Sequence, residues 1–265
     1  MAARAPAPPP ASPRGRYVVD EYDEPRRRPR RGFLRRLVAV LGVLVVVLTV
    51  VSAVLWVVSP GVGDARARTD ALLAEHGGRS IGAQVPGKVA AALIATEDTR
   101  FYSHSGLDLR GAARGAVSLS RGGALGGATI NAQLAKLLYT HNESGFRSST
   151  EEVVLAVKLD QAYTKRQILT MYFDAAYFGH GAYGLASASR IYFGVSPSQL
   201  TWAQSTMLAG LVNAPSAYDP TAHLGLARSR QQHVIHRLVS TKVLTRSQGN
   251  AVFAAPLDPV IPFGG

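Results

Sequence analysis

One long apolar segment dominates the first part of the chain. From Leu37 to Val58 the sequence has 22 consecutive residues without a charge, most of them Val, Leu and Ala. A helix rises about 1.5 Å per residue, so this run would reach roughly 33 Å, enough to cross a hydrocarbon core of about 30 Å. We therefore expect a single transmembrane helix at 37–58.

The flanks of this run predict its orientation. Seven arginines lie between Arg26 and Arg36, ahead of the run, and Trp56 lies at its far end. Cytoplasmic flanks are enriched in Lys and Arg, and Trp favours the membrane interface. We therefore expect residues 1–36 to be a disordered, Arg/Pro-rich cytoplasmic tail of a single-pass cell-membrane protein. A cleaved signal peptide is the alternative, but the basic region and the apolar run are both long for one.

The rest of the chain has apolar positions at helical spacing and no good alternating strands. We expect a linker and first helix at 59–78 and one extracytoplasmic domain at 79–265, in a mostly α fold. Capping boxes, with Gln three residues after the N-cap Thr, are predicted at Thr201 and Thr245. The predicted helices are 66–76, 86–101, 108–120, 129–139, 149–163, 165–174, 183–190, 201–212, 221–241 and 245–254.

Charge and cysteine content narrow the functional class. The formal net charge is +12, and residues 1–36 account for half of it, with 10 Arg against 4 acidic residues. A basic tail beside an apolar run is typical of contact with an anionic lipid surface. Nucleic acid is the competing partner, but no basic platform with interleaved aromatic residues supports it. The absence of cysteine excludes disulfides and thiolate metal sites.

Two glutamates lie on apolar helical faces. Glu97 shares a predicted face with Leu93 and Phe101, and Glu152 shares one with Leu155 and Leu159. A carboxylate in such a place is costly unless it has a partner or a chemical role. Two carboxylates in different environments are what glycosyl chemistry uses, one to activate the incoming oxygen and one to assist the departing group. A structural, salt-bridged Glu is the alternative at each position.

The stretch EDTRFYSHSG at 97–106 resembles the ED-x-x-F-x-x-H-x-G signature of glycosyltransferase family 51, the peptidoglycan transglycosylases. Four further stretches resemble motifs of that family in the same order: GGATINAQLAK at 126–136, YTKRQILTMYFDAAYFGHGAYG at 163–184, RIYFG at 190–194 and LAGLVNAPSAYDP at 208–220. The resemblance is to the monofunctional branch. It implies a lysozyme-like bilobal transglycosylase domain behind a single N-terminal transmembrane helix, with an amphipathic segment at 117–125 that dips into the bilayer.

The resemblance also implies an activity. A family member would polymerise lipid II into β-1,4 glycan with inversion and release undecaprenyl pyrophosphate. Glu97 would be the general base that deprotonates the C4 hydroxyl of incoming lipid II, and Glu152 would assist the leaving group, where a divalent cation, Mg²⁺ or Mn²⁺, could also bind. The predicted substrate-binding residues are Asp98, His104, Gly127, Thr129, Gln133, Lys136, Arg147 and Arg190. The implied partners are lipid II, the growing glycan strand, membrane lipids and penicillin-binding transpeptidases, and not nucleic acid.

The sequence departs from the family's R-K-x-x-E motif. Ser148 and Ser149 stand where two cations precede the second Glu, and Arg147 lies one residue early, where it could compensate. We interpret Asn131, Asp174 and other departures as gathering around the donor phosphate and sugar site. A catalytically degenerate scaffold that binds lipid II or glycan is therefore an alternative to the enzyme, and hydrolysis of finished glycan is another.

Overall fold

The computed structural model describes residues 31–111, 129–141 and 145–264. Within these ranges every regular element is a helix, apart from an isolated antiparallel bridge between Tyr177 and Tyr183. The prediction of a mostly α fold is thus confirmed. The predicted helix at 108–120 falls largely outside the described residues, and the segment at 117–125 falls outside them entirely.

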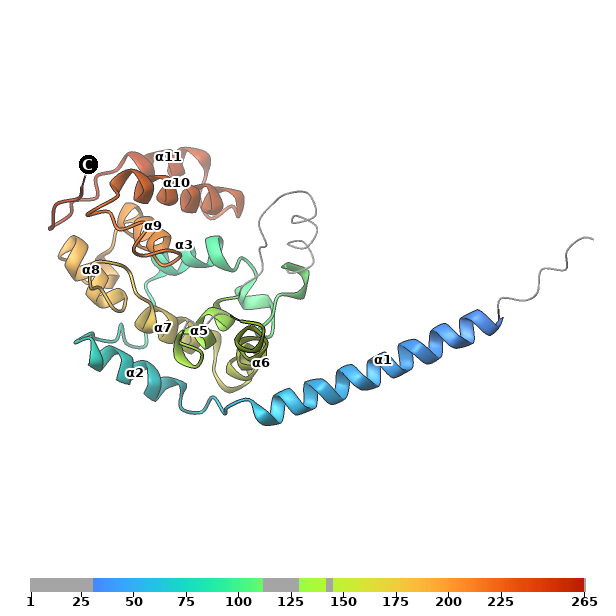
Figure 1. Ribbon diagram of the computed structural model, residues 1–265. Helices are drawn as coiled ribbons and strands as arrows, with labels where there is room; N and C mark the ends of the chain where they lie inside the picture. Colours follow the sequence, from blue (N-terminus) through green and yellow to red (C-terminus); the bar gives the residue numbers. More distant parts are fainter. Residues whose placement is uncertain (1–30, 112–128, 142–144, 265) are drawn as a thin grey trace, which may run out of the picture. The chain divides into compact units, whose positions relative to one another are not determined.

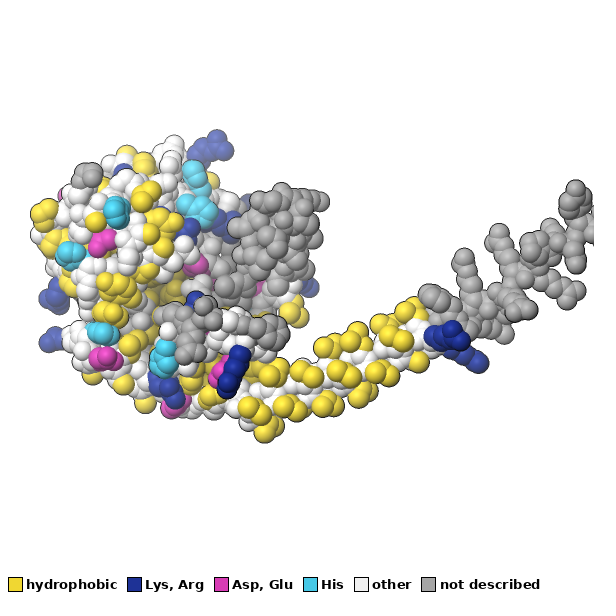
Figure 2. Space-filling model, viewed as in Figure 1, with side chains coloured by type: hydrophobic (Ala, Val, Ile, Leu, Met, Phe, Trp, Pro, Cys, Tyr) yellow, Lys and Arg dark blue, Asp and Glu magenta, His cyan; other side chains and the backbone are white. Residues whose placement is uncertain are grey.

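The first helix is the predicted apolar one. α1 (Arg31–Val58) contains a stretch of 24 residues, Arg35–Val58, with a mean hydropathy of 3.0, which is long and apolar enough to cross a membrane. Figure 2 shows hydrophobic side chains along this helix and cations at its N-terminal end, where Arg35 and Arg36 lie. α1 is therefore compatible with a membrane anchor.

The chain divides into two compact units, Met1–Val50 and Val51–Gly265, and the second contains all the other helices. They are α2 (Ala65–Glu75), α3 (Gly87–Glu97), the 3₁₀ turn η1 (Phe101–Ser103), α5 (Ile130–Leu138), α6 (Phe146–Ala162), α7 (Lys165–Ala175), α8 (Leu185–Phe193), the 3₁₀ turn η2 (Pro197–Gln199), α9 (Trp202–Leu211), α10 (Leu224–Ser240) and α11 (Arg246–Ala254). Apart from 108–120, each predicted helix is present, with its ends shifted by a few residues.

Local sequence fixes several helix starts. Capping boxes are present at Thr201 and Thr245, as predicted, and a further one opens α7 at Thr164. In each, the Thr hydroxyl accepts a hydrogen bond from the backbone N–H of a Gln three residues later, whose side chain accepts from the Thr N–H. The boxes satisfy backbone donors that a helix N-terminus leaves free.

The second unit has two hydrophobic clusters that share α3. The larger cluster includes Leu93 and Phe101 and fills the space among α2, α3, α5, α6, α7 and α8. The smaller one includes Ala92 and Val234, and joins α3 to α9, α10 and α11. In Figure 1, α10 and α11 lie side by side over α9 and α3, and α5 lies beside α6 and α7. The C-terminal end of α3 is therefore placed between α5 and α10.

The loop after α3 is held against α6 at Gly106. Its φ of +88° is in the left-handed region, and a Cβ there would collide with the backbone carbonyl of Ala156 in α6. Only glycine combines this conformation with so close an approach. The glycine of the sequence motif thus lets the loop that follows Glu97 pack directly on α6.

Candidate active site

Glu97 is the last residue of α3, and two other helices supply its partners. Its Oε1 accepts a hydrogen bond from an Nη of Arg230 in α10 at 3.0 Å, and its Oε2 accepts one from Nε2 of Gln133 in α5 at 3.2 Å. The side chains of Glu97 and Arg230 are 12% and 17% exposed, so the ion pair is largely shielded from water. The sequence analysis left open whether Glu97 forms a salt bridge, and in the structure it does so with Arg230. The carboxylate of Glu97 is therefore held by a guanidinium and an amide that come from two different helices.

Gln133 is itself held by Tyr172 of α7. The phenol of Tyr172 donates a hydrogen bond to Oε1 of Gln133 at 2.7 Å, which leaves the amide N–H₂ directed at Glu97. Burial, and after it the charge of Glu97, raise the pKa of Tyr172 above its ordinary value. The phenol therefore keeps its proton and acts only as a donor to Gln133, which makes the two residues a positioning chain for the carboxylate.

Asp98 and His104 form a second buried pair beside Glu97. The Nε2 atom of His104 lies 2.9 and 3.0 Å from the two carboxylate oxygens of Asp98. The backbone N–H of Ile130, the first residue of α5, donates to Asp98 at 3.0 Å. A carboxylate at a helix N-terminus is stabilised by the free N–H groups and the helix dipole. Asp98 thereby links the end of α3 to the start of α5, on which Gln133 lies.

Thr129 completes this connection. Its hydroxyl donates to the carbonyl of Gly106 at 2.7 Å and accepts from the N–H of Ala132 at 3.2 Å, so it caps α5 and fixes the loop. Asp98, His104, Thr129 and Gln133, all predicted to belong to the site, are therefore brought together around the C-terminal end of α3. Their contacts with substrate remain predictions.

The second predicted carboxylate lies on α6. Glu152 accepts a hydrogen bond from the hydroxyl of Thr140 at 2.9 Å, just beyond the end of α5. Ser148, which stands at a motif cation position, is buried, and its hydroxyl donates to the carbonyl of Gly145 at 3.1 Å. Arg147 is exposed in the first turn of the same helix. The N-terminal turn of α6 therefore has a cation at 147 and a hydroxyl that closes the turn at 148.

One side of α5 connects the two glutamates. Gln133, Lys136 and Thr140 follow one another at intervals of three and four residues, so they lie along one side of the helix and its last turn. Gln133 contacts Glu97, and Thr140, two residues past the end of α5, contacts Glu152. Lys136 lies between, half-buried. Along α5, Lys136 thus comes between the residue that contacts Glu97 and the residue that contacts Glu152.

Two residues that depart from the family motifs form contacts within the protein. Asn131 is fully buried and donates to the carbonyl of Ala156 and to Asp160, both in α6. Asp174 is buried and accepts from the N–H of Ile81 at 2.9 Å, and it forms an ion pair with Arg66 of α2. The interpretation that the departures gather around the donor site is wrong for Asp174, because its partners tie α7 to α2 and to the segment before α3.

For two other predicted site residues, the described part of the structure shows no contact with Glu97 or its partners. Arg190 is exposed in the last turn of α8, and Gly127 lies outside the described residues. Within the described part of the chain, no group of three His, Asp or Glu side chains could hold a metal ion by itself. Glu152, which accepts a hydrogen bond from Thr140, offers one carboxylate. This fits Mg²⁺, which usually binds through one or two carboxylates together with substrate phosphates.

Arg230 and Tyr172 were not predicted from the sequence. Arg230 lies beside the buried residues Ala227, Gln231 and Val234 of α10, so an arginine next to an apolar helical stripe was the available signal. Tyr172 lies in the stretch 163–184 that resembles a family motif, but the motif does not indicate which residue the Tyr172 hydroxyl contacts. Both act on Glu97 from distant parts of the sequence, where helical periodicity gives no information about the partner.

The sequence profile described as "Transglycosylase" matches residues 75–239, which is more than half of the chain. The chain belongs to the transglycosylase family. The glutamate site therefore lies within the matched transglycosylase region, and the family identification made from the motifs is confirmed.

Two relatives illustrate the range of the transglycosylase family. Penicillin-binding protein 1A of Neisseria gonorrhoeae is 43% identical over 159 residues, which are 59% of this chain and 20% of that protein. A Cupriavidus necator protein named "Putative transglycosylase" is 38% identical over 175 residues, which are 66% of this chain and 76% of that protein. The chain thus spans about one fifth of the first relative and most of the second.

A solved structure was also found. It is the crystal structure of penicillin-binding protein 1A from Haemophilus influenzae, which is 26% identical and matches 49% of this chain and 16% of that one, with a TM-score of 0.35.

Proposed function

We propose that this transglycosylase is a peptidoglycan glycosyltransferase that polymerises lipid II into β-1,4 glycan and releases undecaprenyl pyrophosphate. The observation that carries the proposal is the setting of Glu97, a largely buried carboxylate held by Arg230 and by the Tyr172–Gln133 chain at the end of α3. Family membership supports the reaction class, and the similarity to penicillin-binding protein 1A supports the substrate class.

In this proposal Glu97 accepts the proton of the C4 hydroxyl of the incoming lipid II. The oxygen forms a bond to the anomeric carbon of the donor strand while the bond from that carbon to the pyrophosphate oxygen breaks, so the configuration inverts. Gln133 and Arg230 hold the carboxylate in place before the reaction, which lowers the cost of reorganisation in the transition state. Asp98 and His104 keep α3 and α5 in register.

The departing pyrophosphate gains negative charge, and cations aimed at it stabilise the transition state. Lys136, on the side of α5 between Glu97 and Glu152, is placed to supply one such charge, and Arg147 is a second candidate. A divalent cation would be held by Glu152 and by the phosphates, and it would neutralise charge on the leaving group. Ammonium and guanidinium contacts to phosphate are charge-assisted hydrogen bonds, each worth about 1.5 to 3 kcal/mol.

A catalytically degenerate scaffold that binds lipid II or glycan is the second candidate. The observation that favours it is Ser148, because a buried, turn-closing serine stands where the family motif has a cation. Fewer cations at the leaving group would slow the chemical step without preventing binding. The scaffold keeps the lipid II site and lacks turnover.

Polymerisation of labelled lipid II by the full-length protein in detergent separates the two. We expect glycan chains from the wild type, and none from Glu97→Gln, which keeps the shape and loses the base. Glu152→Gln should reduce the rate, and the reduction should depend on added Mg²⁺. Glu151→Gln is the matched control, because this neighbour projects about 100° away from Glu152 on the same helix and should leave the rate unchanged.

The outcomes are distinct. Chains that persist in Glu97→Gln would overturn the assignment of the base. Lipid II that binds but is never polymerised by the wild type would favour the scaffold, and shortening of lipid-free glycan would favour a hydrolase.

We further propose that α1 anchors the domain on the outer face of the cell membrane, with residues 1–36 in the cytoplasm. The arginines ahead of the apolar helix support this orientation. Substrate on a lipid carrier and penicillin-binding transpeptidases that cross-link the product would then be the partners. Protease added outside spheroplasts should remove the domain and spare the tail; a protected domain would contradict the orientation.

A further inference from the structure

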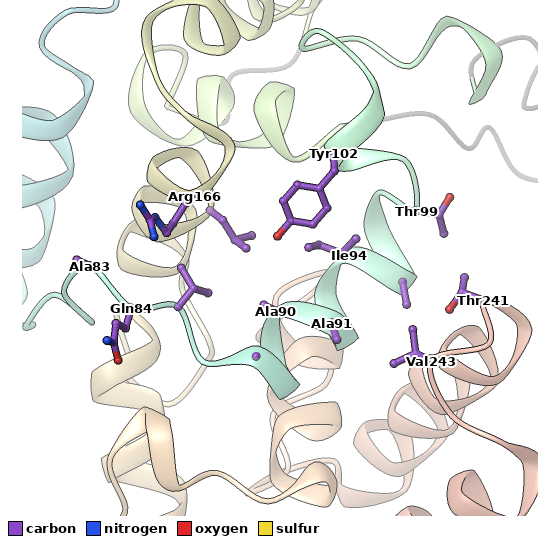
Figure 3. Close-up of a pocket in the computed structure, with 14 residues that line it drawn as sticks. Ala83, Gln84, Ala90, Ala91, Ile94, Thr99, Tyr102, Arg166, Thr241 and Val243 are labelled. Carbon is purple, nitrogen blue, oxygen red and sulfur yellow. The ribbon is translucent and has the colours of Figure 1, made fainter.

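α10 borders pockets on two of its sides. On one side it packs against α3, where Arg230 pairs with Glu97, and the pocket shown in Figure 3 is lined by Ala91 and Ile94 of that same α3. A second pocket, of about 590 Å³, is lined by residues of α10 and α11 alone. Val239 lines this second pocket and comes nine residues after Arg230, which is half a turn around the helix. The second pocket therefore opens on the side of α10 that faces away from Glu97.

The second pocket is a groove between two neighbouring helices, which lie side by side in Figure 1. Residues line it at intervals of three and four along each helix, among them Gln232, Ile235 and Val239 of α10 and Arg246, Gly249 and Phe253 of α11. At Gly249 the helices approach so closely that a Cβ would come 2.9 Å from Cγ2 of Val239. A glycine inside a helix costs about 1 kcal/mol relative to alanine, so close packing explains the glycine here. The groove follows each helix for about two turns, or roughly 10.5 Å.

The floor of the groove is apolar and its rim is polar. Ile235 is only 4% exposed, and Val239 and Phe253 are half-buried, so these side chains lie in the recess. His236 and Arg246 stand exposed at the rim, and within the described part of the chain neither forms an ion pair or a side-chain hydrogen bond. An apolar centre with a polar rim is the usual anatomy of a protein–protein interface.

The charge around the groove has one sign. Residues 221–257, which include both helices, contain five Lys and Arg, three His and no Asp or Glu. Arg246 lies in the first turn of α11, and Arg228 stacks over the ring of Phe253 in the last turn, 4.1 Å from the ring centroid. Cations therefore lie at both ends of the α11 side of the groove. A surface of this kind favours a partner that carries negative charge.

The floor and the rim together narrow the class of that partner. An anionic polymer without apolar groups would leave the recess unfilled. A lipid surface would require apolar side chains that protrude, whereas Ile235 and Val239 lie in a recess. An amphipathic helix with acidic residues beside its apolar stripe satisfies both requirements, because such a stripe fills a groove between helices and its carboxylates then face the rim.

We propose that the groove between α10 and α11 binds an amphipathic, acidic helical segment of another protein. Its apolar stripe would lie against Ile235, Val239 and Phe253, and its carboxylates would face His236 and Arg246. The proposal goes beyond the glycosyltransferase reaction and does not depend on it. Because the groove faces away from Glu97, the bound segment leaves the base open to substrate, so a partner can hold the transglycosylase while it works.

Peptide selection on the full-length protein in neutral detergent tests the groove. The probe is a displayed library of random peptides long enough for about four helical turns. We expect the enriched peptides to repeat Leu, Ile or Phe at intervals of three and four, with Asp or Glu beside them. Fluorescence anisotropy of a labelled, enriched peptide then gives its Kd for each variant of the protein.

Two variants alter the groove in different ways. Arg246→Glu reverses a rim charge, and Asn250→Trp covers the groove from its exposed rim, so each should raise the Kd roughly tenfold. Arg79→Glu is the matched control, because it reverses the charge of an exposed arginine between α2 and α3 and should leave the Kd unchanged. All three variants should polymerise lipid II at the wild-type rate. If the wild type does not polymerise lipid II but shows this binding pattern, the proposed function fails and the groove stands.

Three results would overturn the proposal. The first is a selection that enriches no peptide of the expected kind. The second is equal binding in all variants whose circular dichroism matches the wild type. The third is enrichment of acidic peptides that lack apolar residues and are displaced by inorganic polyphosphate, which would identify a surface for anionic polymers instead of a protein partner.

Discussion

The guanidinium of Arg230 lies 3.0 Å from Oε1 of Glu97, although 133 residues separate the two in the sequence. The pair joins α10 to the C-terminal end of α3, and both side chains are largely buried. In the proposed reaction, Glu97 exchanges part of this contact for a contact with the substrate hydroxyl. Arg230 therefore serves both the stability of the carboxylate and its orientation.

Replacing Arg230 by Gln should reduce both activity and stability. Glu97 would be left largely buried without its cation, and breaking one side of a buried pair costs about 3 to 5 kcal/mol, less here because the pair is partly exposed. We expect Arg230→Gln to lower the melting temperature and to reduce kcat. Arg230→Lys should recover part of both. A normal kcat and melting temperature in Arg230→Gln would show that the ion pair is dispensable.

The Tyr172–Gln133 chain should affect turnover more than substrate binding. Tyr172→Phe removes one hydrogen bond to Gln133, worth about 1 kcal/mol, so kcat should fall several-fold with little change in KM. Tyr139→Phe is the control, because the Tyr139 hydroxyl donates to Asp64, outside the site. Both variants lose a phenol, and only the first should change kcat. An equal effect of the two would show that packing, and not orientation of Glu97, explains the loss.

Helical periodicity predicted nearly all the elements because apolar positions, as in α5 and α10, recur at the spacing of a single buried face. The motif at 97–106 likewise indicated Asp98 and His104. These two residues are only six positions apart in the sequence, and they contact each other in the structure. The partners of Glu97 could not be found in this way. They depend on how α10 and α7 pack against α3 and α5, and packing between distant helices is not encoded in the spacing of either one.

Ser148 also shows what a motif comparison cannot predict. Its position in the motif indicated a missing cation, and only the structure adds that the serine is buried and closes the first turn of α6. A motif comparison counts such a residue as a lost charge. The fold shows that position 148 faces the protein interior in this chain, whereas position 149 is exposed.

Buried phenols should make the fold sensitive to alkaline pH. Burial first, and then the charge of Asp219 and interaction with Tyr177, raise the pKa of Tyr192 above its ordinary value near 10. The folded state keeps the proton where the unfolded chain loses it, so this stabilisation is complete below about pH 10 and is lost as the pH rises further. Melting temperatures measured from pH 8 to 11 should fall at the alkaline end.

The contribution of Tyr192 can be isolated with Tyr192→Phe. This variant loses the hydrogen bond to the carbonyl of Phe178 and should melt lower than the wild type at pH 8. Its melting temperature should then fall less steeply above pH 10, because one titrating phenol has been removed. Parallel curves for the two proteins would show that other groups cause the alkaline loss.

Restoring one motif cation should increase polymerisation. Ser149 is exposed on α6 three residues before Glu152, so a lysine there would project from the same side of the helix as that carboxylate. If charge at the leaving pyrophosphate limits the rate, Ser149→Lys should raise kcat up to about tenfold, the effect of one charge-assisted contact of 1.5 kcal/mol. Gln161→Lys adds the same charge to an exposed position of α6 nine residues after Glu152, on the opposite side of the helix, and should have little effect. Equal gains from both variants would indicate a general attraction of the anionic substrate, and no gain from either would place the rate limit at a step other than departure of the pyrophosphate.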